Sequence, residues 1–528
     1  MRVIIRILGL AVMVCWWASI VQAGDLTSNP LKYHYPVPQV NPPKVIEVDV
    51  CAYGGTPAGV TAAIQAARMG KSAALVVFGR HVGGLTSGGL TATDIGKRKE
   101  IGGLANDFYA RIGKLSGFPP SQAEKVFRDM LQEAKVPVYY EHRLTLVRKD
   151  GNRITEIVME NGNVFRAKMF VDATYEGDLL ARAGVTFHVG REANETYKET
   201  LNGKQFHNAH NFINAVDPYL VEGDPKSGLL KTIWADPPGK PGEGDRCVQA
   251  YNFRMFLTDA PNRVAWPKPV GYDPSRYELL ARYLKTAPPI PLQLKHGDSN
   301  NQGGFSTDHI GANHSWPEGN YQDREKIFQD HVIYQQGLMW FWANDERVPK
   351  DLRDKVNAWG LHPDEFKETG NWSHQLYIRE GRRMVSDYVM TEDNCTSKTA
   401  VEDSVGLAAY QMDSHNCRRI VIDGKVRNEG DVQVACPKPY PIAYRSIVPR
   451  GKECANLFVP VCLSSSHIAY GSIRMEPVFM GLGQSSGTAA ALAIDGNVSV
   501  QKVDYAKLRA KLLQDKHVLE WNPPPKKP

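Results

Sequence analysis

The sequence predicts an α/β protein in which a parallel sheet with helices and a β-meander is interrupted by an inserted α+β region. Residues 45–77 have the pattern of a strand, a glycine turn, a helix of small residues and a second strand. Two hairpin signals, Asp150-Gly151 and Asn161-Gly162, separate alternating strand-like segments further along. A second helix of small residues is expected over residues 477–494, so both ends of the chain contribute to the layered unit.

The first strand and helix have the pattern of a dinucleotide-binding unit. Gly54 permits a tight turn after the strand, and Gly59 lets the helix approach the sheet closely. The free N–H groups and the positive dipole end of the helix would then face a pyrophosphate. The residues expected to bind this cofactor are Gly54, Gly55, Thr56, Pro57, Ala58 and Gly59.

Two positions depart from the usual pattern. Thr56 stands where the middle glycine of Gly-x-Gly-x-x-Gly is common, and Val77 or Phe78 stands where an acidic residue commonly holds a ribose hydroxyl. The ribose must therefore be held in another way. On the motif alone, a βαβ unit without a ligand remains an alternative.

The N-terminus predicts export. Arg2 and Arg6 precede an apolar run over residues 7–21, and Val21-Gln22-Ala23 offers the residues that a signal peptidase needs. We expect a cleavable signal peptide over residues 1–23, which places the protein in the periplasm or outside the cell. An uncleaved anchor is the alternative, and no other segment is apolar for long enough to span a membrane.

Composition excludes several classes of partner. Lys+Arg 63 against Asp+Glu 57 gives a formal charge of +6 over 528 residues, with no basic tract beyond the terminal Lys526-Lys527, so nucleic acid is not expected. The eight cysteines show no Cys-x-x-Cys spacing, so an iron–sulfur cluster or dithiol centre lacks its ligands. In an oxidising compartment, pairing stays open among Cys395, Cys417, Cys436, Cys454 and Cys462.

Residues 79–90 form a glycine-rich segment that is predicted to be neither strand nor helix. Its many backbone N–H groups would follow a long, bent ligand along its ribityl chain and ring, which favours FAD over NAD. A mobile surface loop is the alternative. The residues expected to contact the cofactor here are Gly83, Gly84, Thr86, Ser87 and Gly88.

The next segments predict a helix followed by an antiparallel meander. The helix is expected over residues 121–134, and the strands over residues 144–147, 154–159 and 164–171. The last strand runs into Asp172-Ala173-Thr174, a short turn of the kind with which flavoprotein nucleotide domains return to their parallel sheet. These three residues are therefore further candidates for cofactor binding.

Five blocks together resemble the FAD-dependent oxidoreductase family related to the heterodisulfide reductase A flavin domain. They are residues 53–59 (YGGTPAG), 83–88 (GGLTSG), 172–178 (DATYEGD), 375–384 (QLYIREGRRM) and 470–479 (YGSIRMEPVF), and the resemblance covers residues 45–495. It implies a glutathione-reductase-like FAD/NAD(P)-binding fold, tightly bound FAD and redox chemistry on a substrate that is often unassigned. Some relatives carry a 4Fe-4S cluster, whose cysteine pattern this chain lacks.

The C-terminal block fits the second half of a flavin site. We expect a strand over residues 457–462, a polar turn over residues 464–467 and then the second small-residue helix. If the start of this helix faces the flavin, its free N–H groups after Met475 would stabilise negative charge on the reduced ring by about 0.5–2 kcal/mol. Arg474, Met475 and Glu476 are the cofactor candidates, and a packed core helix is the alternative.

The middle of the chain, residues 191–430, lacks the alternation of strand and helix patterns that is typical of a parallel sheet. It is predicted to be an inserted substrate or cap domain. It holds seven of the tryptophans, whose rings either pack in the core or stack on a sugar or aromatic substrate. Residues 298–321 form a long polar loop with Asp308, His309 and His314. Because no helix or strand fixes their spacing, no metal site is expected.

Three residues are candidates for catalysis. His467 would be a proton acceptor near the flavin, since a neutral histidine is a competent base near pH 7. Arg379, with Arg382 and Arg383, has the spacing of a guanidinium patch on one side of a helix, suited to a carboxylate, a polyol or an oxyanion, and a surface salt-bridge face is the alternative. Arg474 would bind flavin or substrate.

The sequence thus predicts an exported dehydrogenase or oxidase that passes a hydride from a small organic substrate, such as a sugar or polyol, to FAD. Oxygen, a quinone or another exported redox protein would accept the electrons. The alternative is a glycan lyase or glycan-binding protein on an empty FAD-type fold. The expected organisation is a signal peptide (1–23), a surface linker (24–44), two parts of the FAD domain (45–190 and 431–500) around the insertion (191–430), and a C-terminal helix and tail (501–528).

Overall fold

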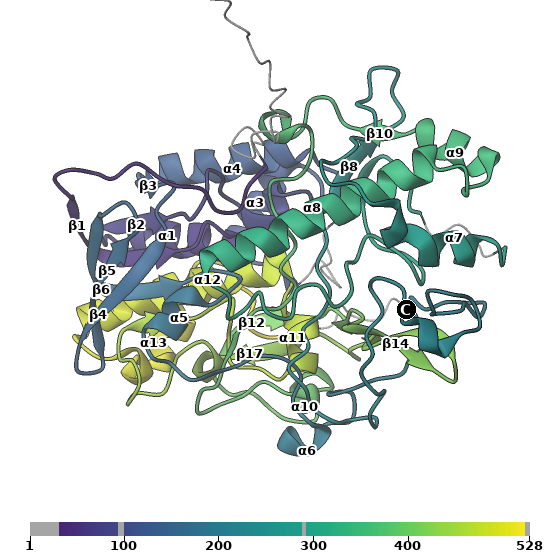
Figure 1. Ribbon diagram of the computed structural model, residues 1–528. Coiled ribbons are helices and arrows are strands. Elements are labelled where there is room, and N and C mark those ends of the chain that lie inside the picture. Colours follow the sequence, from purple (N-terminus) through teal and green to yellow (C-terminus); the bar gives the residue numbers. More distant parts are fainter. Residues whose placement is uncertain (1–30, 93–99, 288–291, 523–528) are drawn as a thin grey trace, which may run out of the picture.

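The structure is a computed structural model, and it describes residues 31–92, 100–287 and 292–522. The chain forms a layered α/β unit that joins its two ends, and the middle region packs beside this unit (Figure 1). The predicted signal peptide and its cleavage point after Ala23 lie outside the described residues.

The central sheet has seven strands in the order β3-β2-β1-β6-β5-β4, with β18 beside β6. The pairs β1–β2, β1–β6, β2–β3 and β6–β18 are parallel, whereas β4–β5 and β5–β6 are antiparallel. The predicted meander is therefore confirmed, and its last strand belongs to the parallel part. The strands are β1 (Val45–Tyr53), β2 (Ala73–Val76), β3 (Val138–Tyr139), β4 (Leu144–Asp150), β5 (Arg153–Met159), β6 (Val164–Asp172) and β18 (Leu457–Phe458).

Two helices of small residues, α1 (Pro57–Arg68) and α12 (Glu476–Asp495), pack directly against each other. Gly483 lies on the contact, where an added Cβ would stand 2.2 Å from the carbonyl oxygen of Ala58. Thr61 Oγ1 donates to the carbonyl of Met480 at 2.8 Å across the same contact. The close approach makes the first and last thirds of the chain one packed unit.

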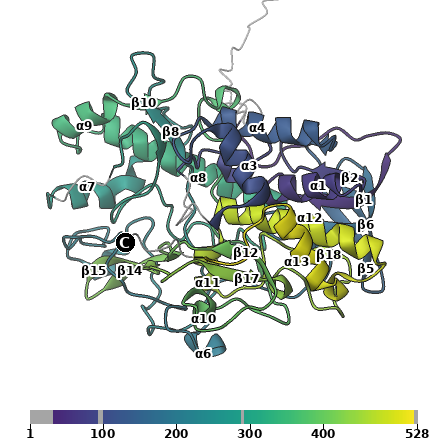
Figure 2. The same cartoon turned by 180° about the vertical axis from the view of Figure 1, so that it is seen from behind.

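The other helices of this unit lie around the same layers, and from behind α4 and α3 are seen above α1 and α12 (Figure 2). The predicted helix over residues 121–134 is observed as α4, and the predicted helix over residues 477–494 is α12. The helices are α2 (Gly84–Ser87), α3 (Gly103–Ile112), α4 (Pro120–Glu133), α5 (Asp178–Arg182), α11 (His467–Ile473) and α13 (Tyr505–Gln514).

Two local predictions were wrong. The glycine-rich segment contains a short helix, α2, because Gly83 at φ 98° and Gly84 at φ 49° turn the chain into it. The strand expected over residues 457–462 is only two residues long, since β18 (Leu457–Phe458) pairs with β6 at Phe170 and Val171 and the chain then leaves the sheet.

The middle region is built around α8 (Tyr321–Asn344), which crosses the front of the molecule in Figure 1. Trp316, Trp342 and Trp372 are fully buried, so these three rings pack in the core and are not displayed for stacking on a substrate. The other helices of this region are α6 (Asn194–Tyr197), α7 (Glu278–Leu284), α9 (Lys350–Asn357) and α10 (Glu392–Cys395).

Small sheets complete the middle region and the return to the layered unit. One has three strands in the order β10-β8-β9, and the others are pairs. The strands are β7 (Phe187–His188), β8 (Met255–Thr258), β9 (Gly297–Ser299), β10 (Gly360–Leu361), β11 (Arg383–Met384), β12 (Ser404–Ala408), β13 (Met412–Ser414), β14 (Arg418–Ile422), β15 (Lys425–Glu429), β16 (Val432–Val434) and β17 (Tyr440–Ala443).

Residues 31–35, expected to belong to a surface linker, instead pack into the molecule. Leu31 is buried in the core, and the ring of Tyr33 stacks on Phe78 with centroids 4.7 Å apart. Tyr33 also meets Trp316 edge-on at 4.7 Å. The sequence did not predict this packing, because Leu31 and Tyr33 are two isolated apolar side chains without a periodic pattern.

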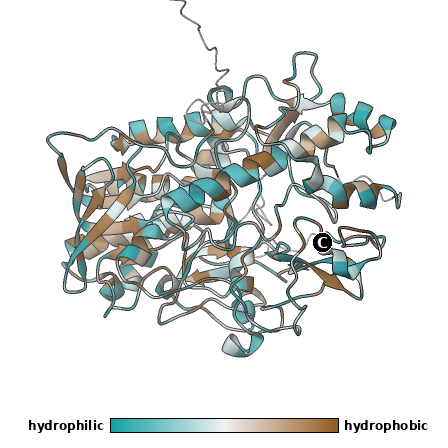
Figure 3. Ribbon diagram, viewed as in Figure 1, coloured by the Kyte–Doolittle hydropathy of each residue, from teal (hydrophilic) through white to brown (hydrophobic). Residues whose placement is uncertain are grey.

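Hydropathy follows burial in the layered unit. Apolar residues gather on the strands of the sheet, whereas α8 mixes polar and apolar residues along its length (Figure 3). Among the described residues, no helix combines the length and the apolar character that crossing a membrane requires.

The glycine contact between α1 and α12 predicts an unusual effect of a small substitution. Gly483→Ala should lower the free energy of unfolding by about 1–3 kcal/mol, because the new Cβ collides with the backbone of α1. Helix propensity alone would raise stability by about 1 kcal/mol. Gly451→Ala is the matched control, since its Cβ would have no neighbour closer than 3.8 Å. Denaturant unfolding of both variants measures the effect, and a Gly483→Ala protein as stable as the wild type would contradict the packing argument.

Candidate functional site

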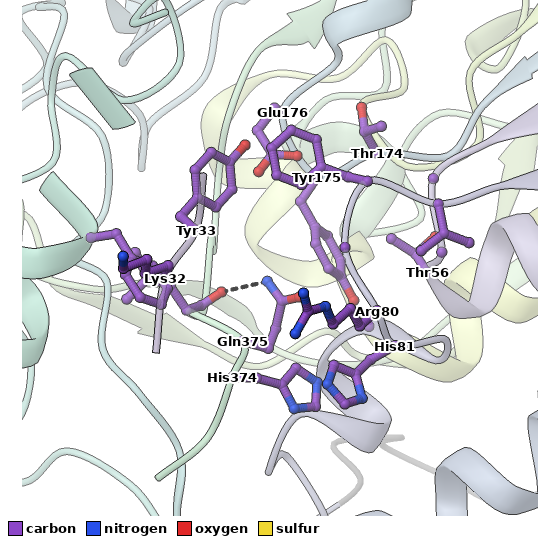
Figure 4. Close-up of a pocket in the computed structure, with 18 of the residues that line it drawn as sticks. Lys32, Tyr33, Thr56, Arg80, His81, Thr174, Tyr175, Glu176, His374 and Gln375 are labelled. Atoms are coloured by element: carbon purple, nitrogen blue, oxygen red, sulfur yellow. Dashed lines mark hydrogen bonds between the residues drawn. The ribbon is translucent and has the colours of Figure 1, made fainter. Parts of the chain in front are cut away.

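A cleft opens where the parallel strands end. It is partly open to solvent, and its walls are formed by several segments that are far apart in the sequence. The walls come from the turn after β1 (Gly54 to Thr56), the segment after β2 (Val77 to His81) and residues 174–176. Residues 31–35 and 374–376 close the other side (Figure 4). This is the edge at which open α/β sheets bind ligands.

The turn after β1 is shaped by Gly54 and Thr56. Gly54 has φ 120°, and an added Cβ would stand 2.5 Å from the backbone of Ala173, so only glycine fits. Thr56 caps α1: its Oγ1 accepts from the N–H of Gly59 at 3.4 Å and donates to the carbonyl of Ala173 at 2.7 Å. Threonine in place of the middle glycine of Gly-x-Gly-x-x-Gly therefore has a structural role: Thr56 ties the start of α1 to the end of β6.

Asp172 organises the backbone next to the cleft. Its carboxylate accepts from the N–H and Oγ1 of Thr174 at 3.1 and 2.7 Å and from the N–H of Leu180 at 2.7 Å. The side chain is fully buried, and this burial raises the pKa of Asp172 to about 6 in spite of those three donors. Of the predicted trio, Thr174 lines the cleft, whereas Asp172 holds the turn beneath it.

Glu476 joins the glycine-rich loop to the start of α12, although Thr86 and Glu476 are 390 positions apart. Its carboxylate accepts from the N–H and Oγ1 of Thr86 at 3.2 and 2.8 Å and from the hydroxyl of Tyr175 at 2.8 Å. The Tyr175 hydroxyl in turn accepts from the N–H of Leu85 at 2.9 Å. The early loop and the late helix therefore meet at one carboxylate beside the cleft.

A buried ion pair connects α8 to the same region. Arg324 donates to both carboxylate oxygens of Asp178 at 2.7 and 2.9 Å, and Arg382 donates to Asp178 at 2.8 Å. Burial favours the neutral carboxyl, but the two guanidiniums outweigh it and hold the pKa of Asp178 below its usual range. Beside it, burial raises the pKa of Glu176, which lines the cleft, to about 7.

The predicted helix that carries Arg379, Arg382 and Arg383 does not form. Residues 379–382 are irregular, and Arg383 begins β11. Gly381 packs on the backbone of Tyr175, where an added Cβ would stand 2.5 Å from the carbonyl oxygen. All three guanidiniums are buried rather than displayed on one face.

His467 is the first residue of α11 and is 2% exposed. Its Nδ1 lies 2.8 Å from Glu380 Oε2, and its Nε2 lies 3.0 Å from Ser414 Oγ. The Glu380 carboxylate also accepts from Arg383 at 2.7 Å, and although burial opposes ionisation, His467 and Arg383 hold the pKa of Glu380 below its usual value. Sequence reasoning missed Glu380, although it lies in the block over residues 375–384, and it missed Ser414, which lies outside all five blocks.

Arg474 lies where α11 meets α12 and lines a small cavity with Thr86 and Glu476. Its guanidinium donates to Asp413 at 2.9 Å and to the hydroxyl of Tyr377 at 2.9 Å. The structure thus places Arg474 near Glu476, whereas His467 is part of a separate hydrogen-bonded group.

The histidines of the long polar loop do not gather around a common point with Asp308. Asp308 binds His415 at 2.7 Å, whereas His309 Nε2 lies 2.8 Å from Asp330. His81 and His374 stack with ring centroids 3.7 Å apart at the rim of the cleft, as Figure 4 shows.

A sequence model of the family described as FAD dependent oxidoreductase matches residues 49–512, which is most of the chain. The chain belongs to this family. It is therefore an oxidoreductase enzyme that uses FAD, and its fold is that of the FAD/NAD(P)-binding oxidoreductases. No curated protein matches it.

Several solved structures match part of the chain. Thioredoxin reductase of T. acidophilum is 20% identical over 29% of this chain and 40% of its own, with a TM-score of 0.18. The flavin-containing monooxygenase of Stenotrophomonas maltophilia is 18% identical over 31% and 46%, with a TM-score of 0.19. L-amino acid deaminase of Proteus vulgaris is 13% identical over 30% and 55%, with a TM-score of 0.22. The chain thus spans about half the length or less of these proteins.

The cleft fits the family's cofactor. A pyrophosphate needs a glycine turn beside a helix N-terminus, and the turn at Gly54 with α1 behind it provides one. Gly84 makes a second close approach, because an added Cβ would stand 2.2 Å from the Tyr175 hydroxyl. Gly54, Gly55 and Gly84 line the same cleft, so one ligand there can contact both glycine turns.

The buried Glu476 predicts a specific pH dependence of stability in the flavin-free protein. Burial raises its pKa to about 7 from an ordinary value near 4.5, so the folded state holds a proton that the unfolded chain has released. Stability therefore falls as pH rises through this window, by at most about 3 kcal/mol from this group. Glu476→Gln cannot ionise and should flatten the slope of unfolding free energy between pH 5 and pH 7.5. Identical slopes for both proteins would show that Glu476 keeps its ordinary pKa.

Proposed function

We propose that this protein is an exported FAD-dependent dehydrogenase or oxidase that takes a hydride from a C–H bond of a small organic substrate, such as a sugar or polyol. The observation that carries the proposal is the meeting of the glycine-rich loop with the start of α12 through Thr86, Tyr175 and Glu476. This contact brings two elements that a flavin site can use, a glycine loop and a helix N-terminus, to one end of the cleft.

The proposed cofactor contacts follow the cleft. The turn at Gly54, Gly55 and Thr56 and the start of α1, with Pro57, Ala58 and Gly59, would hold the pyrophosphate. Gly83 to Gly88, Thr174 and residues 474–476 would hold the remainder. FAD, when bound, supplies the two-electron acceptor. The start of α12 would favour negative charge there by about 0.5–2 kcal/mol.

The proposed proton acceptor is His467. Glu380 holds its Nδ1 and so orients Nε2 toward Ser414, as carboxylates do for catalytic histidines. Ser414 Oγ lies next to Nε2, so a substrate hydroxyl would pass its proton to Ser414 while Ser414 passes its own to His467.

The remaining assignments rest on the sequence. Residues 2–23 have the pattern of a cleavable signal peptide, which supports export. A second glycine motif after a strand is missing from the sequence, so oxygen, a quinone or an exported redox protein is a more suitable electron partner than NAD. Residues 191–430 would form the substrate side of the enzyme.

Flavin content is the first test. The purified mature protein should show the visible spectrum of oxidised flavin, and denaturation should release FAD in about equimolar amount. A colourless protein that stays colourless after incubation with FAD would contradict the proposal and favour the glycan lyase or glycan-binding alternative.

The proton relay is tested by rapid reduction of the flavin under anaerobic conditions, with the substrate found by screening sugars, polyols and their acids. His467→Ala should keep the flavin spectrum and slow reduction by about 10²–10⁴-fold, and Ser414→Ala should slow it as well. His296→Ala is the control, because this histidine is exposed on the surface. Reduction at the wild-type rate in His467→Ala would remove His467 from the role.

A further inference from the structure

Three arginines surround one aromatic ring beside the cleft. The guanidinium carbons of Arg379, Arg474 and Arg254 lie 4.5, 5.9 and 6.0 Å from the ring centroid of Tyr377. They come from three distant parts of the chain, and Tyr377 is 8% exposed. A group of guanidiniums that converges in the interior requires compensating negative charge.

Three carboxylates face this group, one for each arginine. Arg254 pairs with Asp298 at 2.7 Å, Arg474 with Asp413 at 2.9 Å and Arg379 with Asp308 at 3.0 Å. Each of these three pairs is neutral.

A fourth cation enters the same network. His415 lies between Asp308 at 2.7 Å and Asp413 at 3.4 Å, so it shares the carboxylates that already serve two arginines. Burial opposes its charge, but the two aspartates raise the pKa of His415 above its ordinary value. The nearby Asp431 adds little negative charge, because burial raises its pKa to about 7. With His415 protonated, the cluster carries an excess of positive charge.

Several guanidinium nitrogens in this cluster lack a hydrogen-bond partner. They are Nε and Nη2 of Arg379 and Nε of Arg474, whose side chains are 0% and 2% exposed. A buried donor without an acceptor costs about 1–3 kcal/mol, and more when it is charged. Two adjacent N–H groups of one guanidinium form the fork that a carboxylate accepts in bidentate fashion.

The cluster adjoins the cofactor cleft. Residues 374–376 line the cleft, and the same segment continues into Tyr377 and Arg379. On the other side, Tyr377 and Arg474 line the small cavity whose wall also holds Thr86 and Glu476. A small molecule bound at the arginines would therefore lie next to the place proposed for the flavin.

We propose that the substrate is a small hydroxy acid whose carboxylate binds Arg379 and Arg474 beside Tyr377. The assignment rests on the proposed function, since it names the substrate class of the same site. The carbon that bears the hydroxyl loses its hydrogen as a hydride to the bound FAD, and the hydroxyl loses its proton through Ser414 to His467. The product is the corresponding oxo acid, and the electron acceptor reoxidises the flavin.

Matched pairs of ligands test the assignment on the full-length mature protein loaded with FAD. Lactate and propane-1,2-diol share a hydroxylated carbon chain and differ in the carboxylate, and D-gluconate and D-glucitol form a second such pair. Isothermal titration calorimetry should give at least tenfold tighter binding for the acid of one pair. Equal binding of acid and diol in both pairs, or no binding of either acid, would overturn the proposal.

Variants locate the binding site. Arg379→Gln should remove the preference for the acid, and Arg379→Lys should weaken it while keeping the charge, because the bidentate fork is lost. Arg246→Gln, at an exposed surface pair, is the matched control. Tyr377→Phe serves if the buried arginine variants fail to fold: it removes the hydroxyl that accepts from Arg474, and should weaken binding of the acid without affecting the diol.

The test distinguishes this proposal from the proposed function. A protein without flavin contradicts the proposed function, whereas calorimetry reports binding of the acid independently of colour. A flavin-loaded protein that oxidises neutral polyols and ignores both acids keeps the proposed function and overturns the hydroxy-acid assignment. A preference for the acid that survives in Arg379→Gln and in Tyr377→Phe would place the carboxylate elsewhere and also overturn it.

Discussion

The close contact of α1 with α12 is the constraint on which the rest of the structure depends. Gly483 and Gly487 allow this approach, since an added Cβ at either position would lie 2.2–2.4 Å from a carbonyl oxygen of α1. Because α12 is fixed there, its first residue, Glu476, reaches Thr86 and Tyr175 at the edge of the cleft. A site formed from residues almost 400 positions apart thus depends on two helices that approach within backbone distance.

Buried ion pairs hold the middle region against this unit. Arg324 of α8 meets Asp178 at the start of α5, and Arg382 donates to the same carboxylate. Such pairs add little net stability, since burial of both charges offsets their attraction, but the loss of one partner leaves an uncompensated charge. They therefore define one arrangement of the two regions, and the walls of the cleft follow from it. The arginine cluster around Tyr377 differs from these pairs, because Nε and Nη2 of Arg379 and Nε of Arg474 have no hydrogen-bond acceptor.

Local patterns predicted the layered unit well. Strand, turn and helix spacing over residues 45–77, the hairpin turns at Gly151 and Gly162, and the small-residue helix near the C-terminus all depend on neighbours in sequence. The helix expected at Arg379 to Arg383 does not form, and here the chain makes long-range contacts instead: Gly381 packs on the backbone of Tyr175, and Arg383 pairs with His188 of β7. The burial of Tyr33 was missed for a similar reason, since its partners Phe78 and Trp316 come from other segments.

By itself, the sequence determined the fold class, the family and FAD as cofactor, because these are encoded in short motifs and in periodic burial within single segments. Only the tertiary structure decided which side chains share a site. Glu380 and Ser414 beside His467, and the arginines around Tyr377, are brought together by packing between distant segments. Contacts of that kind depend on the balance of burial, charge and hydrogen bonding over the whole molecule, and this balance leaves no local signal in the order of the residues.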